Sequence, residues 1–125
     1  MSEQELNGLT ERIIGCALKV SNTLGCGFLE KVYENALVHE LRKIGLNVWA
    51  QRPIQVIYDG VIVGDFCADV LVADTVIVEL KATKDHDDVF TAQCLNYLKA
   101  TGKPVCLLLN FGKPRLDIRR YRSAE

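Results

Sequence analysis

The amino-acid sequence predicts a mixed α/β (α+β) fold, in which a central mixed β-sheet is flanked by helices and the elements follow the order ααβββαββ. Two observations lead to this prediction. Apolar residues recur at helical spacing through the first 44 residues, and most of the remaining chain consists of runs rich in Val and Ile that are separated by turn residues. A length of 125 residues allows one hydrophobic core, so we expect a single domain over residues 1–125.

Two helices are expected at the start of the chain. The first spans residues 9–24, with Asn7 or Thr10 as its N-cap, and Gly25-Cys26-Gly27 ends it. The second spans residues 28–44, and Gly45 is well placed as its left-handed cap. Because the connection is short, these two helices should pack against each other.

Three strands follow. The first begins near Asn47 and ends at Asp59-Gly60, a dipeptide that favours a tight hairpin, and the second spans residues 61–72. Pro53 cannot donate a ladder hydrogen bond, which suggests that the first strand lies at an edge of the sheet or starts late. The third strand spans residues 75–82.

The last elements are a helix and two strands. Asp87 or Asp88 caps a helix over residues 89–101, which Gly102 ends. The continuous apolar run 105–110 is typical of a buried strand, whereas 116–121 predicts a more exposed one.

Three charged residues, Asp69, Glu79 and Lys81, interrupt the apolar second and third strands. Side chains alternate along a strand, so Glu79 and Lys81 project to the same face. If the turn is a three-residue loop, Val72 pairs with Val76 and Asp69 lies opposite Glu79, with Cβ atoms roughly 5 Å apart. A two-residue loop would place the two carboxylates on opposite faces.

Two ionised carboxylates at that separation repel each other by about 3 kcal/mol at an effective dielectric constant near 20. Either a cation lies between them or one of them is protonated. Hard oxygen ligands in this arrangement suit Mg²⁺ or Mn²⁺. The alternative is an ion pair between a carboxylate and Lys81 on a solvated face of the sheet.

The pattern of an Asp, nine intervening residues and then Glu-x-Lys resembles the PD-(D/E)XK nuclease superfamily, with Ala68 where that superfamily often has proline. The segment GFLEKVY, residues 27–33, is similar to the motif of the GxxExxY protein family. The resemblance spans about residues 9–121. It implies that residues 1–125 form a PD-(D/E)XK nuclease-like domain with a restriction-endonuclease-like core.

The same resemblance implies a metal site. In that superfamily the Asp, the Glu and the carbonyl between Glu and Lys bind a divalent metal, which here corresponds to Asp69, Glu79 and Leu80. A helix carboxylate, here Glu30, often completes the site. From its position alone, Glu30 is equally a first-turn glutamate favoured by the helix dipole.

Three further side chains receive roles from the resemblance. Lys81 would orient or deprotonate the attacking water. Gln93 and Tyr97 form the Q-x-x-x-Y pattern of recombination-type exonucleases in the same superfamily and would position the substrate or the lysine. One helical turn separates them, so both can face the site. Without the other motifs they would be an ordinary polar flank and a core tyrosine.

A basic stretch near the C-terminus is the candidate nucleic-acid contact. Seven basic residues lie between Lys99 and Arg122, against the single acidic Asp117. Five of them, Lys113, Arg115, Arg119, Arg120 and Arg122, are the residues that we expect to follow phosphates. The alternative is a solvated last strand whose charges resist edge pairing.

The expected function is that of a divalent-metal-dependent phosphodiesterase, a nuclease, with DNA as the expected substrate. The alternative is a non-catalytic nucleic-acid- or protein-binding module that retains the nuclease fold, which the net charge of −1 and the small size favour. An exposed edge strand or the first helices could form a two-fold contact and give a homodimer.

The location and redox state are also inferred from the sequence. The N-terminus is polar and acidic and no apolar run approaches the length that crosses a bilayer, so a cytoplasmic location without a membrane partner is expected. The five cysteines are odd in number, widely spaced and without a C-x-x-C pair, which favours reduced thiols.

Overall fold

The computed structural model describes residues 1–124 and contains three helices and five strands. They are α1 (Glu3–Leu24), α2 (Glu30–Lys43), β1 (Val48–Tyr58), β2 (Val61–Val72), β3 (Val76–Lys81), α3 (Asp88–Thr101), β4 (Val105–Asn110) and β5 (Asp117–Arg122). The order ααβββαββ is the predicted one. The mixed α/β architecture is consistent with a restriction-endonuclease-like fold.

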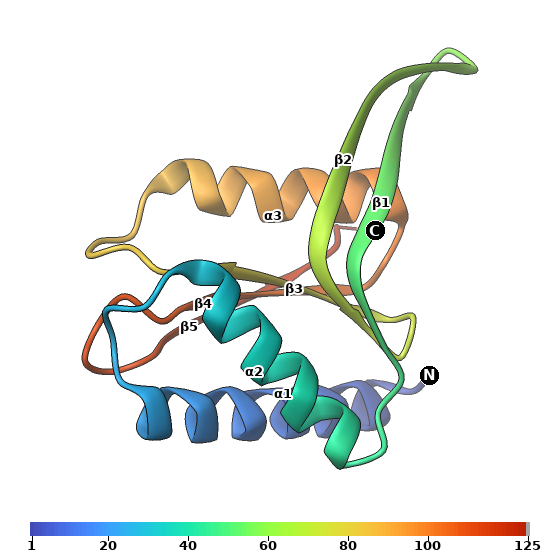
Figure 1. The fold of residues 1–125 in the computed structure, drawn as a ribbon. Coiled ribbons are helices and arrows are strands. Elements are labelled where there is room, and N and C mark those ends of the chain that lie inside the picture. The colour runs from blue at the N-terminus through green and yellow to red at the C-terminus, as the bar shows by residue number, and fades with distance from the viewer. Residues whose placement is uncertain (125) are drawn as a thin grey trace.

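The five strands form one mixed sheet in the order β1-β2-β3-β4-β5. Strands β3 and β4 are parallel, and every other neighbouring pair is antiparallel. Strand β1 lies at an edge, as Pro53 predicted. Helices α1 and α2 lie on one side of the sheet and α3 on the other, while the outer half of the β1–β2 hairpin projects away from the body (Figure 1).

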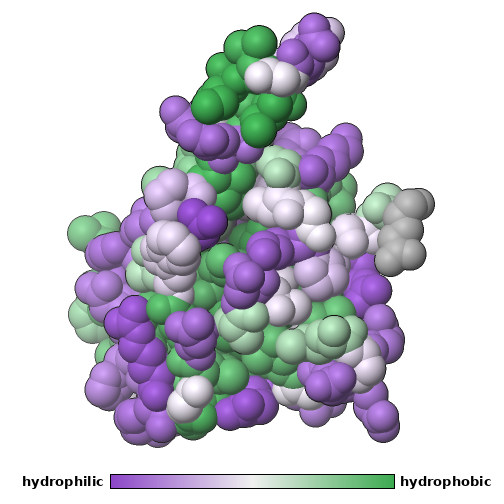
Figure 2. Space-filling view, turned by 90° about the vertical axis from the view of Figure 1, so that its right-hand side faces the viewer, coloured by the Kyte–Doolittle hydropathy of each residue, from purple (hydrophilic) through white to green (hydrophobic). Residues whose placement is uncertain are grey.

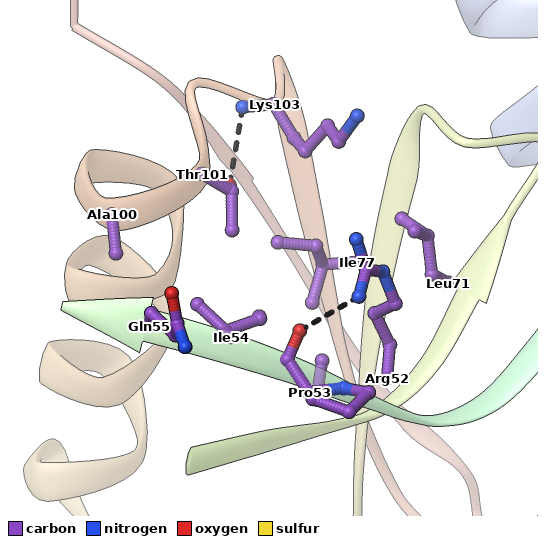
Figure 3. A pocket seen from close by; sticks show the side chains of 10 residues that line it. Arg52, Pro53, Ile54, Gln55, Leu71, Ile77, Ala100, Thr101 and Lys103 are labelled. Carbon is purple, nitrogen blue, oxygen red and sulfur yellow. Dashed lines mark hydrogen bonds between the residues drawn. The ribbon is translucent and has the colours of Figure 1, made fainter. Parts of the chain in front are cut away.

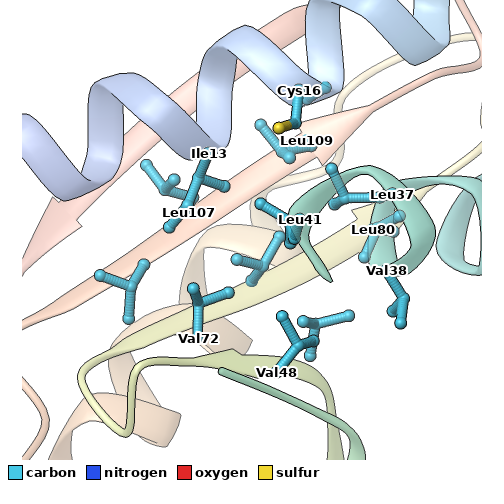
Figure 4. Packing of buried hydrophobic residues seen from close by; sticks show 14 of the residues in the cluster. Ile13, Cys16, Leu37, Val38, Leu41, Val48, Val72, Leu80, Leu107 and Leu109 are labelled. Carbon is cyan, nitrogen blue, oxygen red and sulfur yellow. The ribbon is translucent and has the colours of Figure 1, made fainter. Parts of the chain in front are cut away.

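Each side of the sheet has its own hydrophobic cluster because side chains alternate along the central strands. The larger cluster joins α1 and α2 to the face that carries Val78 and Leu80. Figure 4 shows Leu37 and Leu41 of α2 packed over Leu107 and Leu109 of β4 in this cluster. The smaller cluster joins α3 to the opposite face.

Helix α1 starts earlier than predicted. Ser2 is its N-cap, and a capping box closes the end: Glu5 N–H donates to Ser2 Oγ over 3.0 Å, and Ser2 N–H donates to the Glu5 carboxylate over 3.0 Å. Asn7 and Thr10 therefore lie inside the helix, so the predicted N-cap was wrong. The capping box formed by Ser2 and Glu5 starts the helix at Glu3, before the first residue of the apolar pattern.

Both ends of α3 and the C-terminal end of α2 follow the predicted signals, whereas α2 starts at Glu30 and not at residue 28. Asp87 caps α3 by accepting a hydrogen bond from Val89 N–H, and Gly102 ends it in the left-handed conformation. Gly45, which follows the C-cap Ile44 of α2, also has a positive φ of 85°. Helix α2 begins at Glu30, after Leu29, which has no capping side chain.

Tyr33 fixes the connection between α1 and α2. Its fully buried hydroxyl donates to the Gly25 carbonyl over 2.6 Å and accepts from Phe28 N–H over 3.2 Å. Its ring stacks on Phe111, with centroids 4.8 Å apart. This one side chain thereby holds the loop that positions the first turn of α2, where Glu30 stands.

Two other predictions concern the whole chain. All five cysteines are free thiols, of which Cys16, Cys94 and Cys106 are buried. Within residues 1–124, none of the helices combines the length and the apolar character that crossing a bilayer requires.

Candidate active site

The candidate site lies where β2 and β3 separate. Their ladder runs from the Val72–Val76 pair to the Val70–Val78 pair, which is the register of the three-residue loop and excludes the two-residue alternative. Beyond Val70, β2 leaves the sheet with β1 as the projecting hairpin (Figure 1). A gap in the ladder between two central strands exposes backbone groups that need other partners.

The side chains of Asp69 and Glu79 are these partners. Each carboxylate accepts a hydrogen bond from a backbone N–H of the opposite strand. Asp69 N–H donates to Glu79 Oε1 over 3.1 Å, and Leu80 N–H donates to Asp69 Oδ2 over 2.9 Å. Each carboxylate therefore occupies the place of a missing ladder bond. The two acidic groups that the register predicted to face each other do lie together.

Burial makes this pair costly to ionise. Glu79 is only 3% exposed, and its burial, followed by the negative charge of Asp69, raises its pKa to about 9. Desolvation also raises the pKa of Asp69, although the hydrogen bond from Leu80 N–H opposes that shift. Without an added positive charge, the protein holds a proton at Glu79 at neutral pH.

The donor chemistry of this pair fits a hard divalent cation, because the available ligands are carboxylate oxygens and the missing component is positive charge. Among residues 1–124, however, no three side chains of His, Cys, Asp or Glu are arranged to hold a metal ion. Glu30 therefore does not join Asp69 and Glu79 in a three-carboxylate cluster in this conformation.

Glu30 nevertheless lies within the electrostatic reach of the pair. It is exposed in the first turn of α2, yet partial desolvation and then the charge of Asp69 raise its pKa, while Lys81 opposes the shift. The charges of Asp69 and Lys81, which both come from the sheet, thus shift the pKa of Glu30 in opposite directions.

Glu34, one turn further along α2, is a member of this acidic group that the sequence reasoning did not assign. It is 3% exposed and accepts hydrogen bonds from Gln51 Nε2 over 2.7 Å and from Lys31 Nζ over 2.5 Å. Its negative charge contributes to the raised pKa of Asp69. The signal that could have revealed Glu34 was its spacing of four residues from Glu30 on one helical face.

Lys81 is held above the α3 side of the sheet. Its Nζ donates to Gln93 Oε1 over 3.1 Å and lies 4.6 Å from the ring centroid of Phe90. An ammonium group over an aromatic face is attracted by the ring quadrupole. Gln93 and Phe90 together hold the lysine beside the carboxylates, and Phe90 is the contact that the sequence reasoning missed.

Tyr97 lies one turn beyond Gln93 on α3. Its ring stacks on Phe66 of β2, with centroids 4.5 Å apart. Desolvation, followed by the charges of Glu79 and Asp69, raises the pKa of its hydroxyl. Tyr97 thus connects α3 to the base of the projecting hairpin near the acidic pair.

The basic residues near the C-terminus are not gathered on one surface. Lys113 and Arg119 both pair with Asp117, each over 3.4 Å. On the other side of β5, two arginines contact α1: Arg120 donates to Asn7 over 2.9 Å and Arg122 pairs with Glu3 over 2.7 Å. Arg115 is exposed in the loop before β5. The alternation of side chains along the strand separates residues that are neighbours in sequence.

Two of the cavities that border α3 lie against the β1–β2 hairpin. One, of about 410 Å³, opens at the C-terminal end of α3 against β1, between Arg52, Ile77 and Thr101, and no predicted site residue lines it (Figure 3). The other, of about 610 Å³, lies between α3 and the base of the hairpin, where Gln93 and Tyr97 line it together with Phe66.

Comparison with known proteins gives one match. The family model described as PD-(D/E)XK nuclease superfamily matches residues 7–121. Searches of curated proteins and of solved structures found no match.

Proposed function

Since the chain belongs to the PD-(D/E)XK nuclease superfamily, we propose that it is a divalent-metal-dependent nuclease that hydrolyses phosphodiester bonds, with DNA as the expected substrate. The observation that carries the proposal is the Asp69–Glu79 pair at the gap between β2 and β3, with Lys81 held beside it. The motif formed by Gly27, Glu30 and Tyr33 further supports assignment to the GxxExxY family within that superfamily.

PD-(D/E)XK nucleases generally use divalent metals, and Mg²⁺ or Mn²⁺ is the proposed cofactor here. Asp69, Glu79 and the carbonyl of Leu80 would hold it, and Glu30 would complete the ligand set through a side-chain movement or a water molecule. When bound, such an ion supplies Lewis-acid activation of water and of the scissile phosphate. The high pKa of Glu79 supports this assignment, because a cation would replace its proton.

The remaining roles follow from the contacts around Lys81. Lys81 would orient or deprotonate the attacking water, and Gln93 would fix its ammonium group through the 3.1 Å hydrogen bond. Tyr97 would position the substrate beside the hairpin base. Lys113, Arg115, Arg119, Arg120 and Arg122 are the proposed phosphate contacts, and Asp117 competes for two of them.

A cleavage assay tests the proposal. Labelled single-stranded DNA, double-stranded DNA and RNA are incubated with the protein and Mn²⁺, Mg²⁺ or EDTA. We expect metal-dependent cleavage, which Asp69→Ala should abolish and Lys81→Ala should slow by about 100-fold or more. Glu11→Ala, an exposed acid on α1, is the matched control and should retain full activity. Absence of cleavage of all three substrates by the wild type with Mn²⁺ would contradict the proposal.

The alternative function is a binding module that retains the nuclease fold without cleavage. The net charge of −1 and the pairing of four C-terminal basic side chains with polar or acidic partners favour it. Titration calorimetry with Mn²⁺ and fluorescence anisotropy with labelled DNA separate the two functions. A binding module would bind DNA equally well before and after Asp69→Ala and would release no product.

Two broader predictions remain proposals. We propose one nuclease-like domain over residues 1–125, supported by the single sheet and by the match over residues 7–121. The cytoplasmic location likewise stays a prediction from the sequence.

A further inference from the structure

The outer half of the β1–β2 hairpin is a two-stranded ribbon without further support from the sheet. β1 pairs with β2 along its whole length, whereas β2 pairs with β3 only between Val70 and Val72. Within residues 1–124, neither outward edge of this ribbon has a strand partner. An isolated two-stranded hairpin is only marginally stable in water, so a partner that covers it would stabilise it.

The end of the hairpin is strongly apolar. The exposed apolar residues that we call the hairpin tip are Tyr58 (74% exposed), Val61 (60%), Ile62 (53%) and Val63 (58%). Figure 2 shows these apolar side chains gathered at the top of the molecule. Each of these large apolar side chains is more than half exposed, and together they form one exposed apolar patch. Such a patch marks an interaction surface.

The charge of this region argues against nucleic acid as the occupant. No Lys or Arg occurs between Arg52 and Lys81, while five acidic residues do. Asp59 and Asp65 are the charged residues of the outer hairpin. The acidic side chains of this region would repel a phosphate backbone, and the region has no basic side chain that could bind one.

The cavity of about 610 Å³ lies at the base of the same hairpin. Its walls are Val56, Ile57 and Phe66 from the hairpin and Tyr97 and Ala100 from α3, with polar groups from Gln55, Gln93, Asn96 and Lys99. Lys99 is exposed, and neither Lys99 nor Asp59 has an ion-pair partner among residues 1–124. The molecule thus carries an apolar, acidic projection and, near it, an apolar recess with a lysine.

We propose that the hairpin tip docks into this recess of a second copy of the chain, and that the second copy's tip occupies the recess of the first. When two hairpins cross antiparallel about a two-fold axis, the tip of each copy lies at the base of the other copy's hairpin. The contact between tip and recess therefore occurs twice in the dimer. Asp59 then meets Lys99 across the interface. The apolar tip with its acidic Asp59 and the apolar recess with its lysine are complementary in both polarity and charge.

This contact places the partner's hairpin beside Gln93 and Tyr97, which line the recess. The dimer would therefore form one wall next to the proposed active site in each copy. It would also cover the apolar surface that the monomer exposes.

The oligomeric state tests the inference. Sedimentation velocity over a wide concentration range should show a wild-type species of two 14.0-kDa chains. The double variant Val61→Lys/Ile62→Lys introduces a charge on each face of the tip and should raise the dimer dissociation constant by at least about 100-fold, since the lysines would be buried unpaired. Leu18→Lys, which charges an apolar residue on α1 that is 40% exposed, is the matched control and should still dimerise.

A second comparison tests the recess itself. Lys99→Glu should weaken the dimer by about fivefold, because two acids would face each other, and adding Asp59→Asn should recover most of that loss. Asparagine tolerates the positive φ of 53° at position 59. A wild type that remains a monomer at all concentrations, or a dimer that persists in Val61→Lys/Ile62→Lys, would overturn the proposal. Failure of Asp59→Asn to recover the Lys99→Glu loss would overturn the docking of the tip in this recess.

Discussion

At the scale of single residues, the burial of Asp69 and Glu79 decides the charge of the candidate site, because desolvation is the main cause that raises both of their pKa values. Each carboxylate is fixed by a backbone N–H of the opposite strand, so neither can turn away to solvent without leaving that N–H unpaired. The cost of keeping two negative charges together is instead met by protonation of Glu79. A cation that displaces this proton would restore both charges.

This charge state predicts how stability depends on pH. The pKa of Glu79 rises from 4.5 to about 9 on folding, so between these values the folded protein keeps a proton that the unfolded chain has lost. The free energy of unfolding of the metal-free protein should therefore fall as the pH rises through this window, by at most about 1.4 kcal/mol per pH unit from this group. Urea unfolding at several pH values measures the slope.

Glu79→Gln should flatten that slope, because glutamine cannot ionise. Part of the slope should remain, because the pKa values of Asp69 and Glu30 are raised as well. Glu11→Gln, an exposed substitution on α1, should leave the slope as it is in the wild type. Stability that rises between pH 5 and pH 9 would contradict the raised pKa of Glu79.

At the scale of elements, the ends of β3 and β4 are locked together next to Lys81. The buried Asn110 accepts hydrogen bonds from Thr83 N–H over 3.1 Å and from Gly112 N–H over 2.9 Å. Phe111 N–H also donates to the carbonyl of Lys81 over 2.8 Å. The loop after β4 thereby determines where the strand that carries Glu79 and Lys81 ends.

Among the residues that connect the ends of β3 and β4, Gly112 tolerates no side chain. A Cβ atom at this position would lie 2.2 Å from the backbone oxygen of Thr83. Gly112→Ala should therefore cost about 1–3 kcal/mol of stability and shift the end of β3, which would also lower nuclease activity. Thermal unfolding and the cleavage assay measure both effects.

Gly15→Ala is the matched control for this substitution. A Cβ atom at Gly15 meets nothing within 4 Å, and the residue lies inside α1, so alanine should stabilise the protein by up to about 1 kcal/mol. If Gly112→Ala were as stable and as active as the wild type, the loop would not control the position of Lys81.

At the scale of the whole molecule, the site joins the two sides of the sheet. Glu30 and Glu34 come from α2 on one side, Gln93 and Tyr97 come from α3 on the other, and the ladder between β2 and β3 ends between them. Because helices on both sides depend on this junction, a ligand that binds there should stabilise the entire fold.

Addition of Mn²⁺ should therefore raise the thermal unfolding temperature, and EDTA should reverse the change. At a Mn²⁺ concentration about 100 times its dissociation constant, binding to the folded state alone adds about 2.7 kcal/mol. Asp69→Ala should remove the response, whereas Asp74→Ala, at an exposed turn residue, should retain it. An equal Mn²⁺ effect in wild type and Asp69→Ala would place the binding elsewhere.

Much of the fold could be predicted because its signals are local. The Asp59-Gly60 hairpin, the loop at residues 73–75 and the Gly102 cap each depend on neighbouring residues, and the structure contains all three. The register set by that loop also brought Asp69 to Glu79. The N-cap of α1 was missed although Ser2 and Glu5 carry a local signal, because the apolar pattern was given precedence.

The amino-acid sequence by itself determined the order of the elements and limited the turn between β2 and β3 to two alternatives. The structure contains the three-residue loop, which is the alternative that brings the two carboxylates together. The tertiary structure alone decided that Glu34 and Phe90 join the site, that the C-terminal arginines are divided between the two sides of β5, and that the hairpin leaves the sheet. The physical reason is that turns and caps depend on adjacent residues, whereas these contacts depend on how helices pack on a twisted sheet, which brings together residues far apart in the chain.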